Sequence, residues 1–175
     1  CLSAIDESLG KVIKVLEEMG ELDNTVIIYS SDNGYFMGEH TFLDKRLAYE
    51  NSMRVPMLIR YPDLINKKTK IKEQCLNIDL APTILDLAGI EKPAYMQGES
   101  MLGLLKGEND QNWRESILFE YFQDSYWPYA GPSQIAVRTE RYKLVDAFLA
   151  NDIDELYDLK NDPGEMINLI NEPDY

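Results

Sequence analysis

The strongest constraint on the fold of this chain is an amphipathic helix followed at once by a short apolar strand. Six apolar side chains recur at helical spacing between residues 3 and 19, namely Ile5, Leu9, Val12, Ile13, Leu16 and Met19. Gly20 ends this helix, and Thr25–Tyr29 is a run rich in β-branched residues. A continuous apolar strand after a helix is typical of a parallel sheet that is buried on both faces. The sequence therefore predicts an α/β fold, with a mixed or parallel sheet and flanking helices.

Further elements of the same kind follow along the chain. Val55–Arg60 predicts a second strand. Asp79 is a candidate N-cap for a helix that ends at Gly89, and Pro82 is tolerated in its first turn. The side of this helix that we expect to be buried consists of Ile84, Leu85, Leu87 and Ala88. Met101–Leu105 predicts one more short helix.

The pattern changes near residue 112, after a polar break. Short runs typical of strands follow, at Ile117–Tyr121, Ile135–Arg138, Tyr142–Val145 and Glu155–Leu159. The three residues between the second and third runs suit a tight hairpin. We therefore predict two parts, residues 1–111 and a small antiparallel sheet in residues 112–175.

Charge and composition exclude several classes of protein. The formal net charge of −14 over 175 residues argues against binding to nucleic acid or to anionic membranes, both of which need a basic surface. Hydrophobic residues make up 45% of the chain, which is enough for a packed core, and no apolar run approaches the roughly 20 residues that span a bilayer. His40 is the only histidine, so this segment cannot supply the several nitrogen ligands of a typical zinc hydrolase.

The densest polar cluster follows the first predicted strand, where ligands bind in open α/β sheets. Asp32 and Asn33 offer a carboxylate and an amide oxygen, which suit a hard cation such as Ca²⁺. Two ligands are too few for calcium, so others must come from elsewhere. Asp-Asn-Gly is also common turn chemistry, and these residues taken alone favour the turn.

The segment from Tyr35 to Tyr49 has little periodicity and predicts a long loop, which is uncommon in a compact domain unless it is functional or disordered. Lys45 and Arg46 in this loop could neutralise an oxyanion, or they could be solvated surface charges. A lone histidine such as His40 is more often structural than catalytic, although its ordinary pKa suits proton transfer near neutrality.

A series of short motifs runs along the chain, namely Ser31–Gly34, Gly38–His40, Asp44–Arg46, Tyr49–Glu50, Arg54–Arg60, Asn77–Gly89, Gln97–Ser100, Arg138–Lys143 and Glu155–Glu165. Taken together, these motifs resemble the sulfatase family of the alkaline-phosphatase-like superfamily. No single motif is decisive, but their order and spacing are specific, and they cover nearly the whole chain. The resemblance implies that residues 1–111 are the C-terminal part of a sulfatase domain, and that residues 112–175 are its closing antiparallel subdomain.

The resemblance also implies roles for individual residues. Asp32 and Asn33 match a pair of calcium ligands, and Lys45 matches the lysine that holds a sulfate oxygen during catalysis. His40, as a second catalytic residue, and Arg46, as a substrate-binding residue, lie where substrate-facing residues occur in related members. The Asp44–Arg46 motif is most similar to that of sulfatases acting on glucosamine-type sugars, so a sulfated carbohydrate is the expected substrate.

The family's nucleophile is a formylglycine made from Cys or Ser in a C/S-x-P-x-R motif. Neither the sequence after Cys1 nor that after Cys75 fits this motif. We therefore expect this segment to be the last third of a typical member and to be inactive alone. Members of this kind often act in the periplasm or outside the cell.

Two alternatives remain open. The first keeps the fold but changes the reaction to that of a phosphatase or phosphonate hydrolase; the single histidine counts against it, because those relatives use two transition metals. The second is a calcium-stabilised module that binds sulfated glycans, in which Tyr126, Trp127 and Tyr129 would stack on sugar rings, although such a cluster is more often part of a core.

Overall fold

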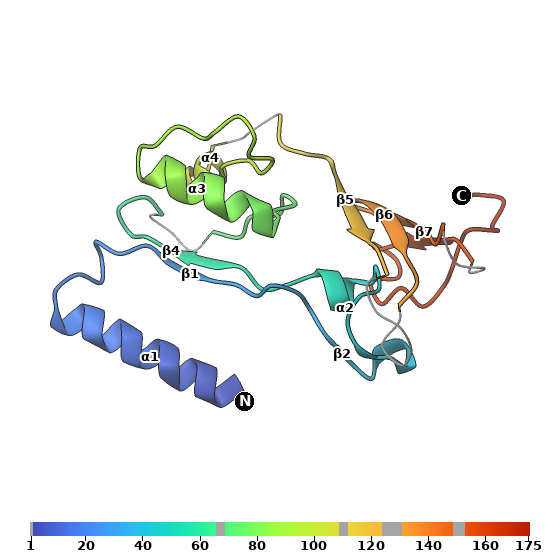
Figure 1. Ribbon diagram of the computed structural model, residues 1–175, viewed down its shortest axis with the longest axis horizontal. Helices are drawn as coiled ribbons and strands as arrows, with labels where there is room; N and C mark the ends of the chain where they lie inside the picture. Colours follow the sequence, from blue (N-terminus) through green and yellow to red (C-terminus); the bar gives the residue numbers. More distant parts are fainter. Residues whose placement is uncertain (1, 66–68, 109–111, 124–130, 149–152) are drawn as a thin grey trace. The chain divides into compact units, whose positions relative to one another are not determined.

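The computed structural model describes residues 2–65, 69–108, 112–123, 131–148 and 153–175 (Figure 1). The chain forms two compact units. The first consists of Cys1–Ser30, Pro56–Ile71 and Asn77–Asp110, and the second consists of Ser31–Val55, Lys72–Leu76 and Gln111–Tyr175. Among the described residues, no helix has the length and apolar character needed to cross a membrane.

The first unit begins with the predicted helix and strand. Helix α1 (Leu2–Glu18) is confirmed, and so are strands β1 (Ile27–Tyr29) and β4 (Leu58–Arg60). The two strands pair antiparallel, with Ile28 opposite Ile59, so the parallel, doubly buried arrangement predicted for β1 is wrong for this pair. An apolar run indicates burial but not strand direction. Parallel strands need a long crossover connection, usually a helix. The structure describes every residue between β1 and β4, and the longest helix among them is the single turn of α2 (Glu50–Met53).

Two short helices complete the first unit, α3 (Leu80–Leu87) and α4 (Leu102–Lys106). Asp79 precedes α3 but does not cap it through its side chain. Because the 3₁₀ turn η2 (Asn77–Asp79) gives Asp79 a helical backbone, its buried carboxylate accepts the N–H of Glu99 at 2.9 Å instead.

The predicted buried side of α3 is also wrong in part. Pro82 and Thr83 are buried, whereas Ile84 is exposed. Contacts made later in the chain decide which face is covered, because the Thr83 hydroxyl accepts the N–H of Met101 at 2.9 Å. Ala88 is exposed as well, while Leu85 and Leu87 are half-buried.

The second unit contains the predicted antiparallel sheet. Its strands follow the sequence order, each pairing with the next: β5 (Ser116–Tyr121), β6 (Gln134–Thr139), β7 (Tyr142–Asp146) and β8 (Glu155–Asp158). Ala136 of β6 and Val145 of β7 form the core of this unit with Ala48, a residue far away in the sequence.

The segment predicted as a long loop is a small hairpin. Strand β2 (Phe36–Met37) pairs antiparallel with β3 (Leu43–Asp44), and the turn η1 (Glu39–Thr41) lies between them. The backbone here is unusual because four non-glycine residues have φ values between 52° and 92°, namely His40, Thr41, Asp44 and Arg46. This conformation is costly for residues with a Cβ, so other contacts must hold it.

Candidate functional site

The predicted metal ligands lie in a turn at the start of the second unit. The Ser31 hydroxyl bonds to the Asn33 carbonyl oxygen at 3.0 Å and to the Asp32 carboxylate at 3.3 Å. Asp32 is exposed, and hydrogen bonds from backbone N–H groups, chiefly that of Asn33, hold its pKa below the ordinary value. Its carboxylate is therefore ionised at neutral pH.

The structure brings Lys45 to the same turn from 12 residues away. Its ammonium group donates to the Asn33 amide oxygen at 3.2 Å, while the Asn33 amide nitrogen donates to the Gly34 carbonyl at 2.6 Å. Gly34 itself is required sterically, because a Cβ at this position would overlap the backbone carbonyl of Asn51. The predicted grouping of Asp32, Asn33 and Lys45 thus has a direct contact within it.

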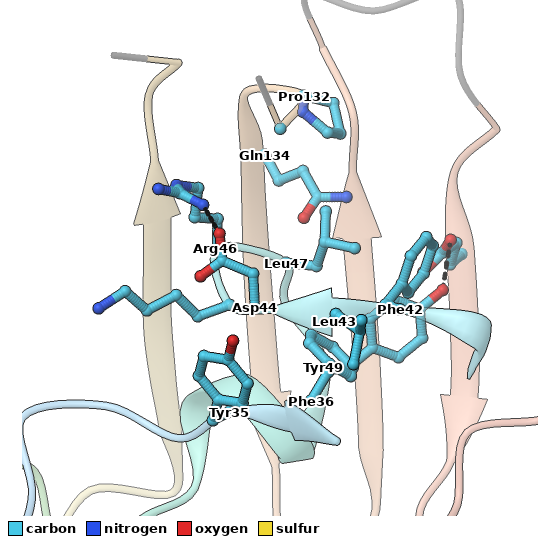
Figure 2. A pocket seen from close by; sticks show the side chains of 13 residues that line it. Tyr35, Phe36, Phe42, Leu43, Asp44, Arg46, Leu47, Tyr49, Pro132 and Gln134 are labelled. Atoms are coloured by element: carbon cyan, nitrogen blue, oxygen red, sulfur yellow. Dashed lines mark hydrogen bonds and ion pairs between the residues drawn. The ribbon is translucent and has the colours of Figure 1, made fainter. Parts of the chain in front are cut away.

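Arg46 lines the same pocket as Lys45 but has different partners. Its guanidinium forms an ion pair with Asp44, and its backbone N–H donates to the hydroxyl of Ser52 at 3.1 Å. Both members of the ion pair are partly exposed and line a pocket (Figure 2).

His40 lies among aromatic rings. Its imidazole packs against Tyr49, with ring centroids 4.3 Å apart, and lies edge-on to Phe36 at 6.2 Å. These contacts fix the ring's orientation at the tip of the hairpin.

The pocket beside Lys45 has a volume of about 760 Å³ and lies within the second unit. Aromatic and aliphatic side chains form much of its wall, and charged or amide groups interrupt that wall (Figure 2). Its lining consists of Tyr35, Phe36, Phe42, Leu43, Asp44, Lys45, Arg46, Leu47, Tyr49, Gly131, Pro132, Gln134 and Glu155. Burial raises the pKa of Tyr49 to about 12, so its hydroxyl keeps its proton and donates to Glu155 at 3.1 Å. Apolar walls with a few oriented polar groups are typical of a small-molecule site.

Comparison with known proteins identifies the family. Residues 38–175 match the family described as "N-sulphoglucosamine sulphohydrolase, C-terminal". The chain belongs to this sulfatase family. The resemblance that we inferred from the motifs is therefore confirmed, and so is the fold class.

Individual relatives agree with this assignment. The chain is 40% identical over 178 residues to N-acetylglucosamine-6-O-sulfatase of Bacteroides thetaiotaomicron, covering 98% of this chain and 31% of that relative. It is 42% identical over 123 residues to an extracellular sulfatase homologue of Drosophila melanogaster, covering 68% of this chain and 11% of the relative. The chain therefore spans about a third or less of the length of these relatives.

Two solved structures show the same fold. One, in complex with its substrate D-glucosamine-2-N,6-O-disulfate, has a TM-score of 0.88 and 37% identity, over 99% of this chain and 35% of the other. A phosphonate monoester hydrolase of Agrobacterium radiobacter has a TM-score of 0.85 and 27% identity, over 99% of this chain and 36% of the other. The fold is thus shared with a phosphonate monoester hydrolase, and of these two structures the one with the disulfated glucosamine is more similar in sequence, at 37% against 27% identity.

The donor set of the sulfatase chain suits a hard divalent cation but is incomplete. Asp32 supplies a charged oxygen, and the Asn33 amide oxygen has two lone pairs, of which Lys45 occupies one. Within the described residues, no three His, Cys, Asp or Glu side chains lie close enough together to hold a metal ion. The residues present therefore fit two ligands of a larger site for a hard divalent cation.

Several residues around the pocket were not singled out from the sequence for any role. Gln134 and Lys143 are almost fully buried, at 4% and 0% exposure, and both contact the backbone of Ala48. A signal did exist for Lys143, because alternation in a strand places it on the same face as the core residue Val145. Lysine is almost never fully buried unless it is paired.

Proposed function

We propose that this chain is the C-terminal part of a sulfatase that hydrolyses a sulfated sugar or a related sulfate ester. Asp32 and Asn33 contribute two calcium ligands, and Lys45 contacts an oxygen of the sulfate group. The observation that carries the proposal is the 3.2 Å contact between the Lys45 ammonium and the Asn33 amide oxygen, next to the ionised carboxylate of Asp32. This turn thus brings together the Lys45 ammonium, which can bind a sulfate oxygen, and the Asp32 and Asn33 oxygens, which can bind a metal ion.

The chemistry required is electrostatic. Sulfuryl transfer resembles phosphoryl transfer, in which positioning and stabilisation of the equatorial oxygens supply most of the catalysis. A bound calcium ion would offset negative charge on the sulfate, and a formylglycine nucleophile is expected in another part of the full-length protein. Within this chain, Lys45 supplies a compact positive charge that Asn33 orients.

The pocket supports a carbohydrate as the group that carries the sulfate. The ion pair of Arg46 and Asp44 presents both donors and acceptors at the wall, which suits sugar hydroxyls, so we assign Arg46 to substrate binding. The relative solved with a disulfated glucosamine is consistent with this class of substrate. His40 is the one imidazole available for proton transfer, and its packing on Tyr49 gives it a fixed orientation. An extracytoplasmic location is consistent with an extracellular relative.

The alternatives have less support. The phosphonate monoester hydrolase shares the fold but is less similar in sequence than the N-acetylglucosamine-6-O-sulfatase, at 27% against 40% identity. For the glycan-binding module, the stacking residues Tyr126, Trp127 and Tyr129 lie outside the described residues.

The test is Lys45→Ala in the full-length protein, assayed with an aryl sulfate and a 6-O-sulfated glucosamine. Removing one preorganised electrostatic contact of this kind typically lowers turnover by about 10²–10³, and we expect a loss of at least about 10² here. Lys160→Ala, which removes the same charge from an exposed position of the same unit, should keep wild-type turnover. Wild-type turnover in Lys45→Ala would remove Lys45 from the site, and faster hydrolysis of a phosphonate monoester than of any sulfate would favour the alternative reaction.

A further inference from the structure

The backbone that carries Lys45 adopts an unfavourable conformation. Asp44 and Arg46, the residues on either side of Lys45, both have φ values of 92°. A residue with a Cβ avoids this region unless the surrounding structure holds it there. Since Lys45 acts through the position of its ammonium group, whatever holds this backbone also sets the geometry of the anion site.

Buried side chains hold this backbone by hydrogen bonds to every second residue, at Arg46, Ala48 and Glu50. Beyond Arg46, whose N–H bonds to Ser52, backbone groups of Ala48 and Glu50 bond to side chains from distant parts of the chain. The Ala48 N–H donates to the Gln134 side-chain oxygen at 3.0 Å, and the Ala48 carbonyl accepts from the Lys143 ammonium at 3.0 Å. The Glu50 N–H donates to the Glu165 carboxylate at 2.7 Å.

These side chains come from the antiparallel sheet and the segment after it. Gln134 begins β6 and lines the pocket (Figure 2), and Lys143 lies in β7. Lys143 is fixed by Glu165 at 2.6 Å and by Glu50 at 2.9 Å. A fully buried ammonium held by two carboxylates is a rigid donor, because moving it would leave charges unpaired.

We infer that Gln134 and Lys143 are positioning residues of the sulfatase site. By bonding to the backbone N–H and carbonyl of Ala48, they hold the strained segment Asp44–Arg46 and thereby the ammonium group of Lys45. This inference rests on the proposed function. It assigns the small antiparallel sheet a part in catalysis, although no strand of that sheet needs to touch the sulfate.

The test is Gln134→Met in the full-length protein, which keeps the side chain's approximate volume but removes the hydrogen-bond acceptor. Small misplacements of a catalytic group can cost up to about 10²-fold in rate, so we expect kcat/KM for an aryl sulfate to fall about 10-fold, mainly through kcat. In the Lys45→Ala background the same substitution should lower kcat/KM less than about 2-fold, because the group being positioned is gone. A purely structural role would lower activity equally in both backgrounds.

A second measurement does not depend on activity. Hydrogen exchange should speed up at least about 10-fold at the amides of residues 44–48 in Gln134→Met, since the Ala48 N–H loses its acceptor. The control is Arg141→Gln, which removes an ion pair with Asp158 in the same sheet but does not contact Ala48. It should leave exchange at 44–48 unchanged and show equal effects in the two backgrounds.

The outcomes separate the two proposals. Unchanged exchange at residues 44–48, or equal losses of kcat/KM with and without Lys45, would overturn the positioning role. A wild-type protein that hydrolyses no sulfate ester would overturn the proposed function instead, and the exchange measurement would still decide whether Gln134 holds this segment.

Discussion

Replacing Lys143 with methionine removes an ammonium group from the interior of the second unit while keeping most of the side chain's length. Lys143 is 0% exposed and contacts two carboxylates, those of Glu50 and Glu165, together with the carbonyl of Ala48. Glu50 would keep a partner, because Arg138 bonds to it at 2.9 Å. Glu165, whose side chain is 1% exposed, would lose its ion pair and, among the described residues, keep only the N–H of Glu50.

The expected cost follows from this inventory. Removing one partner of a buried ion pair costs about 3–5 kcal/mol, because the remaining charge stays buried. We expect the lower end of that range, about 3 kcal/mol, since Arg138 compensates one of the two carboxylates. Adding Glu165→Gln to Lys143→Met should recover at least about 1 kcal/mol, because it neutralises the stranded charge while an amide oxygen can still accept the N–H of Glu50.

Native-state hydrogen exchange measures this cost locally. Peptides covering β6 and β7 report the free energy of opening of this sheet, even within a larger protein. Lys160→Met is the control for loss of a lysine at the surface, and it should change the opening free energy by less than about 0.5 kcal/mol. A Lys143→Met protein within about 0.5 kcal/mol of wild type, or a double variant less stable than the single one, would refute the reasoning.

Two further predictions concern the turn and the edge of the sheet. Gly34→Ala should destabilise the second unit by at least about 2 kcal/mol and lower turnover, because the new Cβ overlaps the Asn51 carbonyl. Gly10→Ala, in open space on α1, should instead stabilise its helix by about 1 kcal/mol. Urea unfolding measures both changes. Hydrogen bonds from Arg141 lower the pKa of Asp158 to about 2. The ionised Asp158 therefore stabilises the fold above its ordinary pKa of 3.8, and this stabilisation is lost as the pH falls toward 2. Asp158→Asn should flatten the profile of stability against pH between pH 4 and 2, and an unchanged profile would contradict this.

Local patterns predicted the positions of the helices and strands well. Periodicity placed α1 and the four strands of the sheet, since each has its own apolar pattern. Strand direction in the β1–β4 pair and the covered face of α3 could not be predicted in this way, because both depend on partners distant in the sequence. The hairpin at Tyr35–Tyr49 was missed for a related reason: its strands are two residues long, which is too short for a period to appear.

Only the residues of the candidate site that belong to a sequence motif could be predicted. The contact between Asn33 and Lys45 agrees with the motif-based grouping, although the residues Asp-Asn-Gly taken alone favoured a simple turn. The residues that hold the site were not predictable, because Gln134 and Lys143 lie more than 80 positions from Ala48 and carry no local pattern that names their partner.

Removal of either of two lysines in the second unit should lower turnover, but only one of the two should lower stability. Lys45 is exposed and, within the part of the chain that the structure describes, bonds to a single amide oxygen. Lys45→Ala should therefore leave the opening free energy of β6 and β7 within about 0.5 kcal/mol of wild type while abolishing most of the turnover. Lys143 is buried among two carboxylates, so its loss should lower stability first and turnover as a consequence. If Lys45→Ala proved as destabilising as Lys143→Met, its effect on rate could not be assigned to the sulfate, and the ammonium group would belong to the structure of the turn instead of the chemistry of the site.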